Sequence, residues 1–157
     1  MFKPRILVAA VGLFILTSVP VMAQAGATVD LGARLGTDLG DVDREFFGVD
    51  VRIGLPALPV TVNPTFDYYG GGNDFYQLSG NALLTLNTAS LPNVTPYVGA
   101  GLGIAHASNN TDIGINLLGG ASISAGPVNP FAQIQLTLLG DVDIIAISIG
   151  ALFRISG

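Results

Sequence analysis

Apolar and polar residues alternate along most of the chain after residue 26, which is the pattern of β-strands with two unlike faces. Glycine recurs every few residues and β-branched residues are abundant, whereas the surface helix formers Lys, Glu and Gln are scarce. We therefore expect an all-β fold. The alternation predicts eight strands, at 27–38, 45–55, 60–69, 74–87, 96–106, 112–125, 130–139 and 144–155.

Each predicted strand has one apolar face, and its other face is small or polar. In 96–106, Leu102 and Ile104 lie on the apolar face, and Gly101 and Gly103 lie on the opposite one. Three acidic and three basic residues fall on the small or polar faces, which are therefore neutral as a set: Asp30, Asp50, Asp67, Arg34, Arg52 and Arg154.

The choice of which face points inward separates two classes of protein. A soluble barrel would show water a surface of Gly, Ser, Thr and Asn with few charges, which is a poor solubilising surface. The reverse placement puts the apolar face in lipid and the polar face in a narrow lumen, as in transmembrane β-barrels. Strands of this length match a bilayer, and closure pairs every backbone group. We therefore predict an eight-stranded antiparallel up-and-down transmembrane β-barrel.

The first segment predicts export. Lys3 and Arg5 precede an uncharged apolar run, 6–22, which is followed by small residues suited to cleavage after Ala23 or Ala25. We interpret 1–25 as a cleaved signal peptide and 26–157 as a single barrel domain.

Composition narrows the possible chemistry. Only 11% of residues are charged, less than half of the usual share of about a quarter. The absence of Cys excludes disulfides, zinc–thiolate sites, iron–sulfur clusters and thiol nucleophiles. Without residues 1–25 the basic residues are four Arg and no Lys, against 11 acids, so the chain lacks the basic surface that binds nucleic acid.

The connections between the predicted strands form two sets. Pro-containing turns at 55–59, 87–95 and 126–130 are expected to face the periplasm, and the other four connections the exterior. Eight acids gather on the exterior side with only Arg44 among them: Asp38, Asp41, Asp43, Glu45, Asp74, Asp112, Asp141 and Asp143. We expect outward aromatics near the strand ends to form an interfacial girdle, and Tyr97 and Phe131 to plug the periplasmic mouth.

Gly-rich stretches at 96–103 and 114–120, followed by Pro130-Phe131, resemble the small eight-stranded outer-membrane barrels of the opacity type and of the OmpX/OmpA-transmembrane kind. The resemblance covers all of 26–157. Residues 149–155 resemble the assembly signal of that family, although the chain ends in Ser156-Gly157 and not in an aromatic residue. The resemblance implies an integral outer-membrane protein, and the short outer loops weigh against an adhesin role.

The charged lumen residues could form an ion path or a neutral structural network, and we favour the network because buried charges need partners. Pairing of the first two strands would bring Asp30 near Arg52, and barrel closure would bring Arg154 toward Asp30. Amide side chains are expected to complete a lumen plug: Asn63, Gln77, Asn81, Asn116, Gln133 and Gln135.

Two motifs could carry other chemistry. A lipid hydrolase could use His106 and Ser108 with an acid such as Asp112, and the spacing in His106-Ala107-Ser108-Asn109 resembles the motif of the lipid A deacylases. The sequence Leu-Gly-Asp-Val-Asp occurs at 39–43 and at 139–143, so Asp41, Asp43, Asp141 and Asp143 could converge and bind Ca²⁺ or Mg²⁺. The alternative for both motifs is solvated loop chemistry.

We therefore predict an integral outer-membrane barrel with a structural or surface-exposed, non-enzymatic role and a lumen plugged by polar side chains. Its expected partners are outer-membrane lipid and, at the acidic loops, divalent cations; no cofactor or nucleic acid is expected, and the chain is expected to be a monomer. Two alternatives stay open: a soluble secreted β-barrel that binds a small apolar ligand, and a lipid-modifying barrel enzyme that uses His106 and Ser108.

Overall fold

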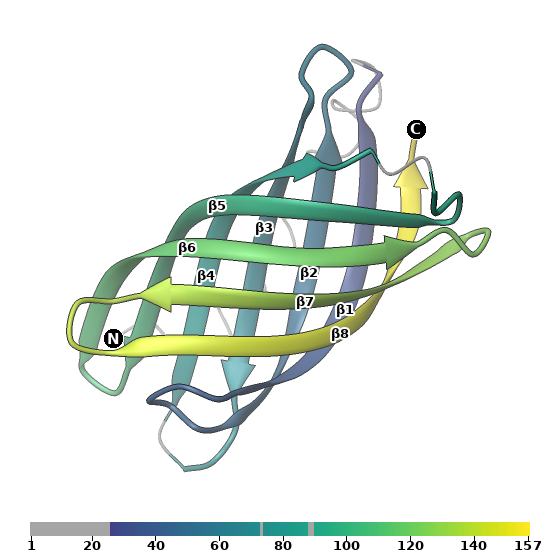
Figure 1. Ribbon diagram of the computed structural model, residues 1–157. Coiled ribbons are helices and arrows are strands. Elements are labelled where there is room, and N and C mark those ends of the chain that lie inside the picture. The colour runs from purple at the N-terminus through teal and green to yellow at the C-terminus, as the bar shows by residue number, and fades with distance from the viewer. Residues whose placement is uncertain (1–25, 73, 88–89) are drawn as a thin grey trace.

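The chain folds into one closed barrel in which every strand is antiparallel to both of its neighbours (Figure 1). The computed structural model describes residues 26–72, 74–87 and 90–157; the predicted signal peptide, 1–25, lies outside them. The strands are β1 (Thr28–Asp38), β2 (Glu45–Gly54), β3 (Val60–Tyr69), β4 (Phe75–Thr85), β5 (Val94–Ala107), β6 (Asn110–Ile123), β7 (Val128–Leu138) and β8 (Asp143–Ser156). All eight predicted strands are confirmed to within two residues at each end. No helix in the described ranges is long and apolar enough to cross a membrane.

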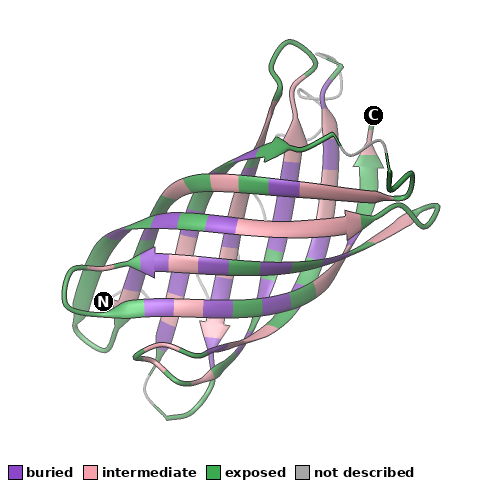
Figure 2. Ribbon diagram, in the orientation of Figure 1, coloured by how far each residue is buried: buried purple, intermediate pink, exposed green. Residues whose placement is uncertain are grey.

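Exposed and buried residues alternate along the strands, because successive side chains of a strand point to opposite faces (Figure 2). The outward positions hold large aliphatic side chains that are largely exposed, among them Ile113 at 70%, Ile149 at 65% and Leu102 at 60%. Val29 and Val51 are exceptions to the alternation and are buried. The predicted placement of the faces is confirmed: the apolar face is outside.

The connections lie at two ends of the barrel, which we name by their residues. The described residues of the loop end are 39–44, 70–72, 74, 108–109 and 139–142, and those of the turn end are 55–59, 86–87, 90–93 and 124–127. Because the number of strands is even, β1 begins and β8 ends at the turn end (Figure 1).

Candidate functional site

The lumen is the candidate site, and an ion pair between β1 and β3 lies at its centre. Arg34 Nε donates to Asp67 Oδ1 at 2.8 Å, and Arg34 Nη2 pairs with Asp67 Oδ2. Both side chains are 2% exposed. The pair passes over β2 at Gly48, which is the register partner of both residues. A Cβ at Gly48 would lie 2.1 Å from Asp67 Oδ1, so only glycine leaves room for this pair.

Asp50 joins this pair to a second arginine. Its Oδ1 accepts from Arg52 Nε at 3.2 Å and from Asn63 Nδ2 at 2.9 Å. Its Oδ2 lies 3.8 Å from Arg34 Nη1 and, within the described part of the chain, has no hydrogen-bond partner. Two arginines and two aspartates thus meet in the barrel interior, and this buried cluster has no net formal charge.

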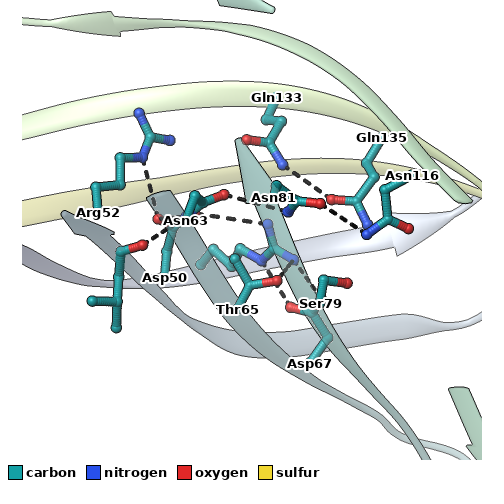
Figure 3. Close-up of polar contacts among 12 residues, drawn as sticks. Asp50, Arg52, Asn63, Thr65, Asp67, Ser79, Asn81, Asn116, Gln133 and Gln135 are labelled. Carbon is teal, nitrogen blue, oxygen red and sulfur yellow. Dashed lines mark hydrogen bonds and ion pairs between the residues drawn. The ribbon is translucent and has the colours of Figure 1, made fainter. Parts of the chain in front are cut away.

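Amide and hydroxyl side chains extend the cluster around the lumen (Figure 3). Asn116 Nδ2 donates to Asn81 Oδ1 at 2.9 Å, and Thr137 Oγ1 donates to Asn116 Oδ1 at 2.8 Å. Gln77 Nε2 donates to Thr137 Oγ1 at 3.0 Å. Asn81 and Asn116 meet over Gly101 of β5, where a Cβ would lie 2.5 Å from Asn81 Oδ1. All six amide residues predicted for the plug are buried: Asn63, Gln77, Asn81, Asn116, Gln133 and Gln135.

Aromatic rings fill the lumen toward the turn end. The Arg52 guanidinium carbon lies 4.5 Å from the ring centroid of Tyr97 and 4.6 Å from that of Phe131, a cation–π arrangement. Arg52 Nη2 also donates to Tyr97 Oη at 2.9 Å, and Tyr97 Oη donates to Gln133 Oε1 at 3.1 Å. The expected position of Tyr97 and Phe131 inside the barrel is confirmed, since each is 4% exposed.

An apolar cluster fills the lumen toward the loop end. Its aromatic members are Phe46, Tyr69 and Phe75, with ring centroids 5.0 Å apart for Phe46–Tyr69 and 4.8 Å apart for Tyr69–Phe75. Val42 and Leu139, from two different loops, pack against the cluster. The interior therefore has three layers: apolar at the loop end, polar and charged in the middle, and aromatic around Arg52.

Two charged residues predicted for the lumen network lie apart from it. Asp30 and Arg52 are register partners as expected, but Arg52 pairs with Asp50, and Asp30 pairs with Arg154 across β1 and β8. The Arg154 side chain is 47% exposed. The expected approach of Arg154 to Asp30 on barrel closure is confirmed, and the pair that they form stands beside the cluster of Arg34, Asp50, Arg52 and Asp67 and not within it.

The two acidic loops at the loop end meet as predicted. Asp41 N–H donates to the Asp143 carbonyl at 2.9 Å, and Asp143 N–H donates to Asp41 Oδ2 at 2.8 Å. Asp43 and Asp141 are exposed. Among the described residues no group of three or more His, Cys, Asp or Glu side chains could hold a metal ion. The two loops therefore meet, as the cation prediction requires, but the described carboxylates do not form a group that could hold a cation.

His106 lies on the outward face at the end of β5, and its partner is not Ser108. Its Nδ1 hydrogen-bonds to Thr111 Oγ1 at 2.8 Å, and its ring stacks on Tyr76 with centroids 4.9 Å apart. Ser108 is exposed in the following turn, with a φ of 52°. The histidine is thus held by a cross-strand pair, since His106 and Thr111 are register partners on β5 and β6.

Sequence reasoning missed two features of the interior. The apolar cluster at the loop end follows from extending the inward parity of β2, β3, β4 and β8 to Phe46, Tyr69, Phe75 and Ile144, so the signal for it was present. Asp38, which the sequence groups with the loop acids, is fully buried and accepts hydrogen bonds from several backbone N–H groups. The alternation places Asp38 on the inward face of β1 with Arg34, but it does not identify the N–H groups that the carboxylate binds.

A closed eight-stranded barrel with an apolar exterior and a polar, filled interior has the architecture of the small outer-membrane β-barrels. Three solved structures of that class have this fold. The N-terminal β-barrel domain of Pseudomonas aeruginosa OprF is 15% identical, with a TM-score of 0.66 over 81% of this chain and 96% of that one. Neisserial surface protein A is 21% identical, with a TM-score of 0.62 over 82% of this chain and 97% of that one.

The third structure is the outer-membrane enzyme PagL, which is 12% identical with a TM-score of 0.53, over 80% of this chain and 99% of that one. No protein-family model and no curated protein matches the sequence. PagL is described as an enzyme, and the other two barrels are not. The fold by itself therefore does not decide whether this chain is an enzyme.

Proposed function

We propose that the chain is exported through a signal peptide at 1–25 and inserted into a bacterial outer membrane, where it is a non-enzymatic barrel with a closed lumen and surface-exposed loops. The observation that carries this proposal is the inverted distribution of polarity. Leu102, Ile113 and Ile149 are largely exposed on the outward face, whereas Arg34, Asp50 and Asp67 are buried inside. Such an exterior favours a lipid surrounding over water.

The filled lumen supports a structural role over a transport role. The charged cluster is neutral and hydrogen-bonded to its surroundings, and aromatic or apolar layers lie on both sides of it. An eight-stranded barrel has an interior just wide enough for side chains to fill. We therefore expect no stable conductance when the purified barrel is reconstituted in a planar lipid bilayer.

The first experiment is fractionation of cells that express the full chain, followed by SDS gels of boiled and unboiled samples. Recovery in the outer-membrane fraction with a boiling-dependent shift in migration is the expected result, because a closed barrel resists SDS until it is heated. Recovery in the soluble fraction without a shift would reject the proposal and favour the secreted barrel that binds an apolar ligand. The polar contents of the lumen already weigh against an apolar ligand there.

The lipid-modifying enzyme is the second candidate, and the position of His106 on the outward face near the loop end favours it over other enzymes. In this candidate His106 and Ser108 would act on a membrane lipid. His106→Ala and Ser108→Ala would then each change the lipid composition of the cells that express the chain. We expect both variants to fold and to leave the lipids unchanged, and a change with both variants would establish the enzyme.

A further inference from the structure

The β1–β8 pair is the one neighbouring pair of described strands that no short connection joins. In each of the other seven pairs, a short connection holds one end of the pair together and fixes its register. β1 and β8 are the first and last strands, so noncovalent contacts alone hold them side by side (Figure 1). If the barrel opens anywhere, separation here needs no hairpin to be pulled apart. We call the β1–β8 pair the seam.

The seam is fastened at the loop end by the carboxylate of Asp38. Its Oδ1 accepts from Ile145 N–H of β8 at 2.7 Å and from Gly40 N–H at 3.0 Å. Its Oδ2 accepts from Val42 N–H at 2.8 Å and from Asp43 N–H at 2.9 Å. One fully buried side chain thus holds the 39–44 loop and the start of β8 at the same time.

The pairing continues into the loop beyond the end of β1. Leu39 N–H donates to the Ile145 carbonyl at 2.8 Å, and Asp41 N–H donates to the Asp143 carbonyl at 2.9 Å. The bond from Asp143 N–H to Asp41 Oδ2 adds a second side-chain contact across the seam. Hydrogen bonds from N–H groups to a carboxylate are stronger than those between neutral groups.

The turn end of the seam is fastened by the Asp30–Arg154 pair. The two residues are register partners, and Arg154 donates to both carboxylate oxygens of Asp30. The register of β1 and β8 shifts between Val29 and Asp30, so the pair stands at the last regular position of the seam. β1 therefore contributes a carboxylate that binds β8 at each end.

We propose that the seam is the place where the barrel opens and closes, and that Asp38, with Asp30 and Arg154 at the other end, latches it shut. This inference does not depend on the cellular role of the protein. It predicts that loss of a latch speeds unfolding, and that a covalent link across the seam, but not elsewhere, makes the latch unnecessary.

The chain has no Cys, so disulfides can be placed without background. Ala33 and Ala151 are register partners across the seam, and Ala82 and Ala100 are register partners across β4 and β5. Paired residues in antiparallel strands have Cα atoms about 4.5–5.5 Å apart, within the range of a disulfide. The double variant Ala33→Cys/Ala151→Cys thus links the seam, and Ala82→Cys/Ala100→Cys is the matched control at a hairpin.

The measurement is the rate at which the folded gel band is lost in SDS at a fixed raised temperature, for the chain without residues 1–25 refolded in detergent. Asp38→Ala is expected to unfold about tenfold faster, which equals about 1.4 kcal/mol of barrier. The oxidised 33–151 link should restore the slow rate in the Asp38→Ala background, and the oxidised 82–100 link should not. An unchanged rate for Asp38→Ala, or equal rescue by the two links, would overturn the proposal.

The turn end provides the variant to use if Asp38→Ala does not fold. Asp30→Ala should also unfold faster, and the same two disulfides should differ in rescuing it. The double exchange Asp30→Arg/Arg154→Asp should unfold nearly as slowly as the original chain, because two opposite charges again face each other across the seam. If Asp30→Ala unfolds at the original rate, or if both links rescue it equally, the latch is excluded at this end.

Discussion

Gly48 shows how one missing side chain determines the arrangement of the charges in the lumen. Arg34 on β1 and Asp67 on β3 are separated by β2, and they meet because Gly48 leaves the space above β2 open. Gly101 does the same between Asn81 and Asn116. Because a buried ion pair that loses its geometry leaves charges without compensation, the inner glycines matter for stability as well as for space.

We predict that Gly48→Ala lowers the free energy of unfolding by about 1–3 kcal/mol, the usual cost of overpacking a filled interior. The control is Gly80→Ala, another strand glycine, where a Cβ would meet nothing within 4 Å. That control should be neutral or slightly stabilising, because Gly in a strand costs about 0.5–1 kcal/mol relative to Ala. Unfolding by urea in detergent, followed by far-ultraviolet circular dichroism, measures both. Equal effects of the two changes would contradict the role given to Gly48.

Within each strand, the alternation of side chains separates an apolar outward face from a polar face in the lumen. On β5 the outward Leu102 is 60% exposed, and the neighbouring Gly101 and Gly103 face the polar lumen. Aromatic residues on the outward face form a row near the loop end: Phe47 and Tyr68 have ring centroids 5.5 Å apart, and Tyr76 stacks on His106. Such rows suit the level of lipid headgroups, so the strands define both the apolar band and one of its limits.

We predict that Leu102→Arg lowers the free energy of unfolding in lipid vesicles by about 2–4 kcal/mol, the cost of a cation near the middle of a bilayer. Leu39→Arg is the matched control, since Leu39 is equally exposed at 60% but lies in the 39–44 loop. It should cost at most about 1 kcal/mol, because the cost falls toward the interfaces. Two equally small effects would mean that Leu102 does not face lipid.

The molecule as a whole has unlike ends. The loop end brings together the acidic connections, including the two Leu-Gly-Asp-Val-Asp sequences, whose loops hydrogen-bond to each other. The two copies place different apolar residues inward. In 39–43 Val42 packs against the interior apolar cluster and Leu39 is 60% exposed, whereas in 139–143 Leu139 packs against the cluster and Val142 is 38% exposed. The turn end carries the ends of the barrel chain and the Pro-containing turns. This difference between the two ends predicts how the barrel is oriented in the membrane.

We predict that the loop end faces the outside of the cell. A membrane-impermeant maleimide added to intact cells should label Asn109→Cys, in the 108–109 turn, and should not label Ala57→Cys, in the 55–59 turn. Both positions are exposed, and the native chain has no Cys. After the outer membrane is permeabilised, both variants should react. Labelling of Ala57→Cys alone in intact cells would reverse the orientation.

Much of the lumen could be predicted because parity in a strand is strict. Arg34, Arg52, Asp50 and Asp67 fall on the small or polar face of their strands, and all four are buried in the barrel. Their partners could not be predicted from parity. Arg34 pairs with Asp67 two strands away, because its long side chain reaches over Gly48 of the strand between them. Arg52 pairs instead with Asp50 of its own strand.

The sequence by itself determined the number of strands, their limits to within two residues and the face that most side chains take, because strand alternation and turn residues are local properties of the chain. The tertiary structure decided which side chains meet once the barrel closes. Asp38 became a latch because closure brings Ile145, far away in the sequence, to its carboxylate. His106 paired with Thr111 and not with Ser108 because the register of β5 and β6 places Thr111 opposite it. Contacts across strands depend on register and closure, which no single stretch of sequence contains.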